Sequence, residues 1–307
     1  STLLRCIAAG ICNKIPGDGR EFCVTVDEAV TVRAEDGRYV SSCNVSAFIS
    51  NLPCSLDTRH FSTTEASGST SQAANVVEAV EMGATAFLVD EDVSAANFMA
   101  RDGRMRAMVM EESITPLLYR VNGLYATHGI SSVVVVGGVG DWLDVPNTVV
   151  LMDKYICKDA TAKALSVSRQ FSHGLVQYAG RGVVHRLPWE KSGTPIPRRP
   201  VVSAHCSHDM SETVVSLLDG NDTISLQQIT EDEDSMALDE HENTIDMSRC
   251  EQLLGKKHQL YGCGLCVAWI LDQARKQPDI GLRDLLRKLD EAMDEKGLSA
   301  MILEDSI

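Results

Sequence analysis

The stretch Thr85-Ala86-Phe87-Leu88-Val89-Asp90-Glu91 decides the fold. Consecutive apolar residues are followed by two carboxylates, which is the pattern of a buried strand that ends at the ligand-binding edge of an α/β sheet. An Asp at such a strand end can hold Mg²⁺, and a Glu beside it can orient and deprotonate an attacking water. Asp90 and Glu91 are therefore candidate catalytic residues, although apolar strands also end in Asp-Glu at ordinary exits to loops.

Helices and apolar strands alternate on both sides of this stretch. The predicted helices span residues 1–12, 72–82 and 115–128, and the predicted apolar strands span 85–89, 132–136 and 148–152. Paired strands at 21–26, 29–34 and 39–45 are expected to form a small antiparallel sheet. The alternation predicts an α/β fold, a mixed sheet with helices on both faces and a small antiparallel subsheet.

Composition limits the classes of partner. The 307 residues are 44% apolar, and 43 acidic against 28 basic residues give a net charge of -15. Such a charge repels phosphate backbones, so any nucleic-acid contact must use a local basic patch. The longest apolar runs fall short of the ~20 residues of a membrane span, so no membrane partner is expected. The ten irregularly spaced cysteines favour reduced thiols and an intracellular location.

The texture of the chain changes after residue 158. The sequence predicts one α/β domain over 1–158 and a partly helical C-terminal domain over 159–307, with a basic linker at 180–200 and an acidic loop at 231–243. The basic residues of the linker are Arg181, Arg186, Lys191, Arg198 and Arg199, with His185 and Trp189 interleaved. This stretch is a candidate grip on single-stranded RNA through phosphate contacts and stacking, or an ordinary solvated linker.

A run of small hydroxyl residues and glycine precedes the helix at 72–82. Ser67, Gly68 and Ser69 begin this run, which can offer backbone N–H groups and hydroxyls to a phosphate. The same composition is typical of a capped helix start.

These features together resemble the ATP-binding-cassette (ABC) ATPases. In that family a Ser-Gly signature opens a helix, a strand ending in Asp-Glu follows, and a loop with Ser-Ala comes next, as Ser94-Ala95 does here. Ser1-Thr2-Leu3-Leu4 resembles the end of a phosphate-binding loop of the form Gly-Lys-Ser-Thr-Leu-Leu, whose glycines and Lys are expected just before residue 1. The resemblance implies a P-loop NTPase fold of the ABC type over residues 1–158.

A closer likeness concerns one group within this class. Residues 15–22, 33–38, 51–53, 66–72 and 90–97 are similar to predicted ABC-class ATPases of bacteria and of kinetoplastid mitochondria, including the ATPase of the kinetoplastid RNA-editing accessory complex. This likeness implies RNA and an RNA-processing complex as partners. It also implies a mitochondrial location for a kinetoplastid protein and a cytoplasmic one for a bacterial protein.

The ABC resemblance implies roles for individual residues. Ser1 and Asp90 would ligate Mg²⁺, and Glu91 would be the general base for hydrolysis of ATP. The nucleotide-binding residues would be Ser1, Thr2, Ser67, Gly68, Ser69, Ser94 and Asp141. The signature residues 67–69 would act on nucleotide held by a second copy, so a homodimer closed by ATP is implied. An ATP-clamped scaffold or an RNA-binding module with little turnover is the alternative.

Three departures from the family pattern bear on activity. The phosphate-loop Lys is absent from the given residues, and without it nucleotide binding is expected to be poor. Ser69 stands where the signature has its second glycine, and Gln72 is displaced. Gly137-Gly138-Val139-Gly140-Asp141 stands where most family members have a switch histidine, so hydrolysis is expected to be slow unless Asp141 substitutes.

Two weaker patterns complete the set of candidates. Asn44, Ser46 and Asn51 lie in the interval where the family has a γ-phosphate-sensing glutamine. Cys263-Gly264-Leu265-Cys266, with His205 and His208, could supply zinc ligands, but its apolar neighbours favour a buried helix in which Cys behaves as a small hydrophobe.

Overall fold

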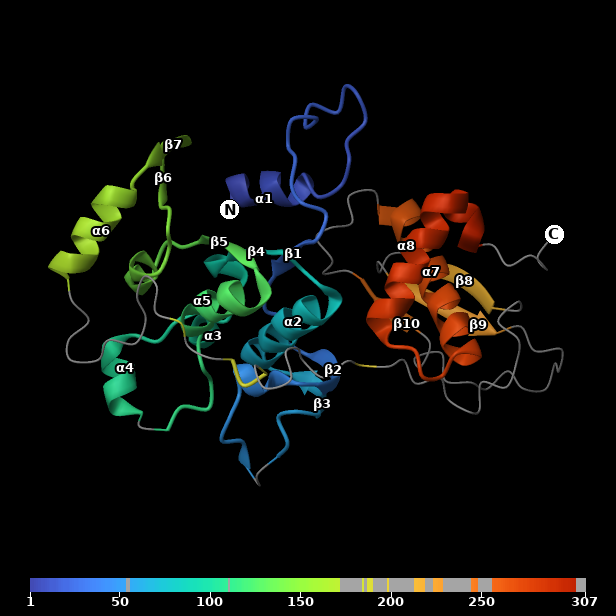
Figure 1. Cartoon of the computed structure of the whole chain (residues 1–307), viewed down its shortest axis with the longest axis horizontal. Helices are drawn as coiled ribbons and strands as arrows, with labels where there is room; N and C mark the ends of the chain where they lie inside the picture. Colours follow the sequence, from blue (N-terminus) through green and yellow to red (C-terminus); the bar gives the residue numbers. More distant parts are fainter. Residues whose placement is uncertain are drawn as a thin grey trace. The chain divides into compact units, whose positions relative to one another are not determined.

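The chain divides into two compact units. The computed structural model describes residues 1–53, 56–109, 111–171, 184, 187–189, 198, 213–218, 223–228, 244–247 and 256–301. The units are Ser1–Ile196 and Pro197–Ile307 (Figure 1). This division comes later than the expected change at residue 158, because α6 (Thr161–Gln170) packs against the short helix η4 (Gly140–Asp144) and Trp189 is buried in the first unit's core.

A parallel sheet forms the centre of the first unit. Its strands are β1 (Ala29–Val32), β4 (Ala86–Asp90) and β5 (Ser131–Val135), in the order β1-β4-β5. Val32 pairs with Val89, and Asp90 pairs with Val135. All three strands therefore end at the same edge of the sheet, which places the segments that follow them side by side.

Helices cover this sheet as the alternating pattern predicted. Figure 1 shows α1 (Thr2–Ala9) and α2 (Gly68–Met82) on opposite sides of it, and α5 (Leu117–His128) leads into β5. The α2 helix ends at Gly83, whose φ of 91° is a left-handed conformation that favours glycine. The α/β fold class is thus confirmed.

Two expectations about strands were wrong. Residues 21–26 form no strand, and β1 pairs in parallel with β4 instead of with them. The side chains of Val24 and Val26 are exposed, 84% and 53%, so these valines lack the packed face that stabilises a strand. The antiparallel pair is β2 (Arg38–Cys43) with β3 (Phe61–Ala66).

The predicted strand at 148–152 also takes a different place. It is β6 (Val150–Asp153), which pairs antiparallel with β7 (Ile156–Asp159) instead of extending the parallel sheet. Lys154 and Tyr155, both with positive φ, form the two-residue turn that hairpins of this kind require.

The remaining elements of the first unit are short. They are η1 (Val45–Ala47), η3 (Glu91–Val93), α3 (Ala96–Met99) and α4 (Gly103–Met108). In the described part of the second unit, three strands form an antiparallel sheet and two long helices follow; the strand order is β10-β9-β8. Their bounds are β8 (Thr213–Leu218), β9 (Thr223–Gln228), β10 (Thr244–Asp246), α7 (Lys256–Lys276) and α8 (Leu282–Lys296), followed by η6 (Gly297–Met301). No helix among the described residues is long and apolar enough to cross a bilayer.

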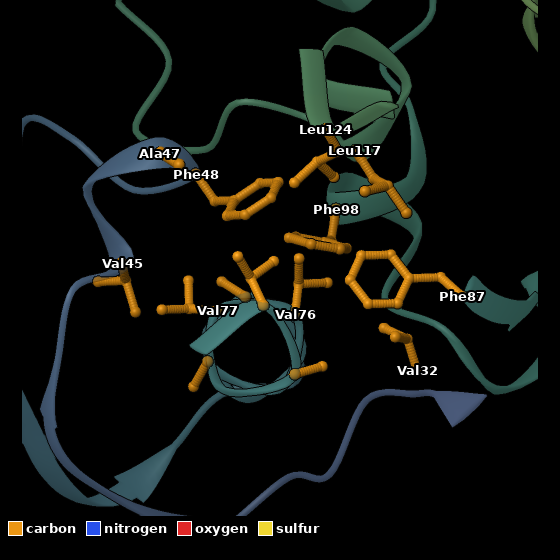
Figure 2. Close-up of a cluster of buried hydrophobic side chains, with 14 of the residues drawn as sticks. Val32, Val45, Ala47, Phe48, Val76, Val77, Phe87, Phe98, Leu117 and Leu124 are labelled. Carbon is orange, nitrogen blue, oxygen red and sulfur yellow. The ribbon is translucent and has the colours of Figure 1, made fainter. Parts of the chain in front are cut away.

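The core of the first unit lies between α2, the parallel sheet and the segment that follows β4. Phe48, Phe87 and Phe98 are all fully buried there, and Figure 2 shows their rings gathered over the valines of α2. The Phe48 and Phe98 ring centroids are 5.1 Å apart. Since Phe87 belongs to β4 and Phe98 to α3, this cluster fixes the chain on both sides of the Asp90-Glu91 pair.

We expect Phe87→Ala to lower the free energy of unfolding of the first unit by about 3–5 kcal/mol, because it leaves a cavity beneath β4. Urea unfolding followed by the fluorescence of Trp142 and Trp189, both buried in this unit, measures the change. Phe22→Ala is the matched control, because Phe22 is 98% exposed and its loss should change stability by less than about 0.5 kcal/mol. Equal effects of the two substitutions would contradict this core.

Candidate functional site

Asp90 lies at the end of the central strand and is almost fully buried, with 9% of its surface exposed. Its Oδ1 accepts a hydrogen bond from the backbone N–H of Asp92 at 3.3 Å, which caps η3. A carboxylate held at a strand end with its second oxygen unused by this cap suits a hard cation such as Mg²⁺. Asp90 is thus a residue of this edge that could hold a metal ion.

Glu91 is fixed by backbone groups of the neighbouring strand's exit. Its Oε2 accepts hydrogen bonds from the N–H of Gly137 at 2.6 Å and the N–H of Gly138 at 2.8 Å. Both glycines follow β5, and bonds from N–H groups to a carboxylate are stronger than neutral ones. The structure therefore brings the predicted general base together with the glycine segment that stands in place of a switch histidine.

A buried glutamine links α2 to the same edge of the sheet. Gln72 is fully buried in α2; its Nε2 donates to Ser94 Oγ at 2.9 Å, and its Oε1 accepts from Ala95 N–H at 2.9 Å. Ser94 Oγ in turn donates to the backbone oxygen of Asp90 at 2.7 Å. Sequence reasoning treated Gln72 as displaced from its usual position and missed this role, although an amide among the apolar residues of a buried helix is a signal that it has partners.

The start of α2 packs against the segment that follows β1. Ser71 Oγ accepts from the N–H of Glu35 at 2.9 Å, and a Cβ placed on Gly68 would lie 3.1 Å from Asp36 Oδ1. Ser67 is exposed, and within the described residues its hydroxyl does not cap the helix but lies 3.1 Å from Thr70 Oγ1. Ser69 is half-buried in the first turn.

Ser1 and Thr2 are exposed at the N-terminal end of α1, which packs against β1 and β4. Leu4 is the buried residue of this helix, and Thr25 fastens its other end by donating from Oγ1 to the Ile7 carbonyl oxygen at 2.6 Å. No hydrogen bond joins Ser1 to Asp90 among the residues that the structure describes. The packing of α1 places Ser1 and Thr2 on the helix that covers the carboxylate strand.

The other nucleotide-binding candidates of the first unit make contacts away from the Asp90-Glu91 pair. Asp141 is in η4, near Tyr119. Burial raises the pKa of Tyr119, Arg106 opposes this rise, and the charge of Asp141 adds to it. Asn44 Oδ1 accepts from the Ser46 hydroxyl at 2.6 Å, which closes the turn of η1. The segment after β1 reaches the edge instead, because Ala34 N–H donates to the Val93 carbonyl oxygen at 3.0 Å.

The basic linker is described only in part. Arg198 lies in the second unit, where its carbonyl oxygen accepts from Leu282 N–H at 3.0 Å. The expectation that Trp189 stacks on RNA bases was wrong, because its ring is 2% exposed and packs near Phe48 and His128. The predicted residues that lie outside the described part of the chain are Arg181, Arg186, Lys191, Arg199, His185, His205, His208 and the acidic loop 231–243.

The cysteine pair of the second unit lies in α7. Cys263 and Cys266 are both half-buried. Burial raises the pKa of the Cys266 thiol, and the nearby Cys263 adds to the rise, so the metal-binding thiolate form is disfavoured. Among the described residues no three potential metal ligands lie together.

We expect Gln72→Leu to lower the free energy of unfolding by about 1–3 kcal/mol, because the Ala95 N–H loses its partner in a part-buried hydrogen bond. Gln170→Leu, at an exposed position of α6, is the matched control and should have little effect. Urea unfolding of both variants measures the difference. A Gln72→Leu protein as stable as the parent would show that this bridge contributes nothing.

The comparison with protein families bears on this arrangement of carboxylates, signature helix and glycine segment. The model of the ABC_ATPase family, described as a P-loop domain, matches residues 1–185. No curated protein matches the chain. The match covers more than half of the chain and includes the whole edge at which Asp90, Glu91 and Gly138 meet. The chain therefore belongs to the ABC_ATPase family of P-loop proteins.

Proposed function

We propose that this protein is a Mg²⁺-dependent ATPase with Glu91 as its general base. The observation that carries the proposal is the Glu91 carboxylate, held by the N–H groups of Gly137 and Gly138 beside the buried Asp90 at the end of the central strand. Membership of a P-loop ATPase family supports nucleotide as the ligand.

Asp90, with the Ser1 hydroxyl, would hold the Mg²⁺ that neutralises charge on the phosphates. Glu91 would accept a proton from a water molecule while the oxygen of that water forms a bond to the γ-phosphorus. The bond from the γ-phosphorus to the bridging oxygen breaks, and ADP and inorganic phosphate leave. The N-terminus of α1 would bind the phosphates with a loop that we place, from the likeness of Ser1-Thr2-Leu3-Leu4 to a phosphate-loop end, ahead of Ser1.

ATP would also join two copies of the chain. In this proposal Ser67, Gly68 and Ser69 of one protomer meet the nucleotide of the other, and the exposed Ser67 at the start of α2 is suited to such a contact. The buried Gln72 would carry the state of this contact to Ser94 and the end of β4. Coupling to single-stranded RNA through the basic stretch 180–200 rests on the sequence resemblance and local charge.

We expect Glu91→Gln to reduce ATP turnover by about 10²–10⁴-fold, because the amide cannot accept the proton. Affinity for ATP and ATP-dependent dimerisation should be retained. The assay uses protein that carries a Gly-Xaa-Gly-Lys phosphate loop ahead of Ser1, and follows phosphate release and light scattering with and without single-stranded RNA. Glu111→Gln, an exposed carboxylate of the same unit, is the matched control and should keep the parent rate.

Three other results have distinct meanings. A parent protein that binds ATP without turning it over contradicts the ATPase and supports the ATP-clamped scaffold. A parent that does not bind ATP contradicts both. A rate and dimerisation that single-stranded RNA leaves unchanged contradict the coupling to RNA alone.

A further inference from the structure

We propose that Gly137 and Gly138 are the positioning element for Glu91, a role that rests on the proposed function. Their N–H groups converge on one oxygen, Oε2, at 2.6 and 2.8 Å. Among the described residues Oε1 accepts no hydrogen bond, so it is the oxygen left to take a proton from water. The pair of N–H groups thereby fixes which carboxylate oxygen reacts and in which direction it lies.

Strand register sets this contact. Asp90 pairs with Val135 across the parallel sheet, so Glu91 leaves β4 beside the exit of β5. Two successive backbone N–H groups aimed at one anion form a cradle that fixes a negative charge. A backbone donor does not titrate between pH 5 and 8, unlike a histidine, so this contact holds Glu91 without a proton switch of its own.

The two positions differ in whether they need a glycine. A Cβ on Gly138 would lie 3.1 Å from Glu91 Oε1, which is tighter than nine in ten real Cβ contacts, so the carboxylate would have to move by a few tenths of an ångström. A Cβ on Gly137 would have no heavy atom within 4 Å, so that residue contributes its N–H group and not its small size. The side-chain requirement therefore falls on position 138.

The test is a graded series at position 138 in the protein with its phosphate loop. Gly138→Ala should lower kcat for ATP about tenfold, because a small displacement of a reacting group is costly, and Gly138→Val should lower it further. The Kd for Mg-ATP should not change. Gly262→Ala in α7 is the control, because a Cβ there meets no heavy atom within 4 Å and Gly262 lies outside the glycine segment 137–141.

Rescue separates positioning from a merely structural effect. The shorter side chain of Glu91→Asp leaves room for a Cβ at 138, so adding Gly138→Ala to Glu91→Asp should cost less in kcat than adding it to the parent. Equal costs in the two backgrounds, or an unchanged kcat in Gly138→Ala, would overturn the proposal while leaving the ATPase intact.

A parent protein without ATP turnover would contradict the proposed function but not the contact between Glu91 and the two glycines. Amide hydrogen exchange tests that contact without any need for turnover. Slow exchange of the Gly137 and Gly138 amides in the parent and faster exchange in Glu91→Ala support the contact, because the substitution removes the oxygen that accepts both hydrogen bonds. The same exchange rates in both proteins overturn it.

Discussion

Parallel pairing of β4 between β1 and β5 is the constraint on which this site depends. It brings the exits of three strands to one edge, so that residues 34–37, 91–95 and 136–138 become neighbours although they are far apart in the chain. Each exit is then tied to the middle one by hydrogen bonds, from Ala34 to Val93 on one side and from Gly137 and Gly138 to Glu91 on the other. The Glu91 carboxylate is therefore held by backbone N–H groups and not by another side chain.

The buried side-chain amide of Gln72 connects α2 to the segment that follows β4. It joins α2 to Ser94 and Ala95, and Ser94 joins the end of β4. The α2 helix is therefore connected to the strand that carries the carboxylates by a short chain of hydrogen bonds. Such a buried network is costly to leave half-satisfied, so its members are expected to move together or not at all.

The sequence allowed the local part of this arrangement to be predicted, because local patterns determine it. Four apolar residues before Asp90, and helical periodicity before and after, were enough for the central strand, its two flanking helices and the candidate base. Residues 21–26 show the limit, since alternating β-branched residues form a strand only where another element packs on them, and here Val24 stays exposed.

Contacts set by register could not be predicted in the same way. Glu91 and Gly138 are 47 positions apart, and Gln72 and Ser94 are 22 apart, so no local pattern indicates either bond. The burial of Trp189 could not be predicted for a related reason. An aromatic ring among arginines is typical of an RNA-binding surface, but long-range packing against Phe48 placed it in the core.

The proposed ATPase requires this edge of the sheet to bind the metal and phosphates of ATP. The most direct measurement is NMR line broadening by Mn²⁺-ATP, with Mn²⁺ in the place of Mg²⁺, on protein that carries its phosphate loop. We expect the amide signals of Asp92, Gly137 and Gly138 to broaden first, and those at the opposite end of the same strands, such as Ala86 and Ser131, to broaden last. Unchanged signals at Gly137 and Gly138 while other regions broaden would contradict binding at this edge.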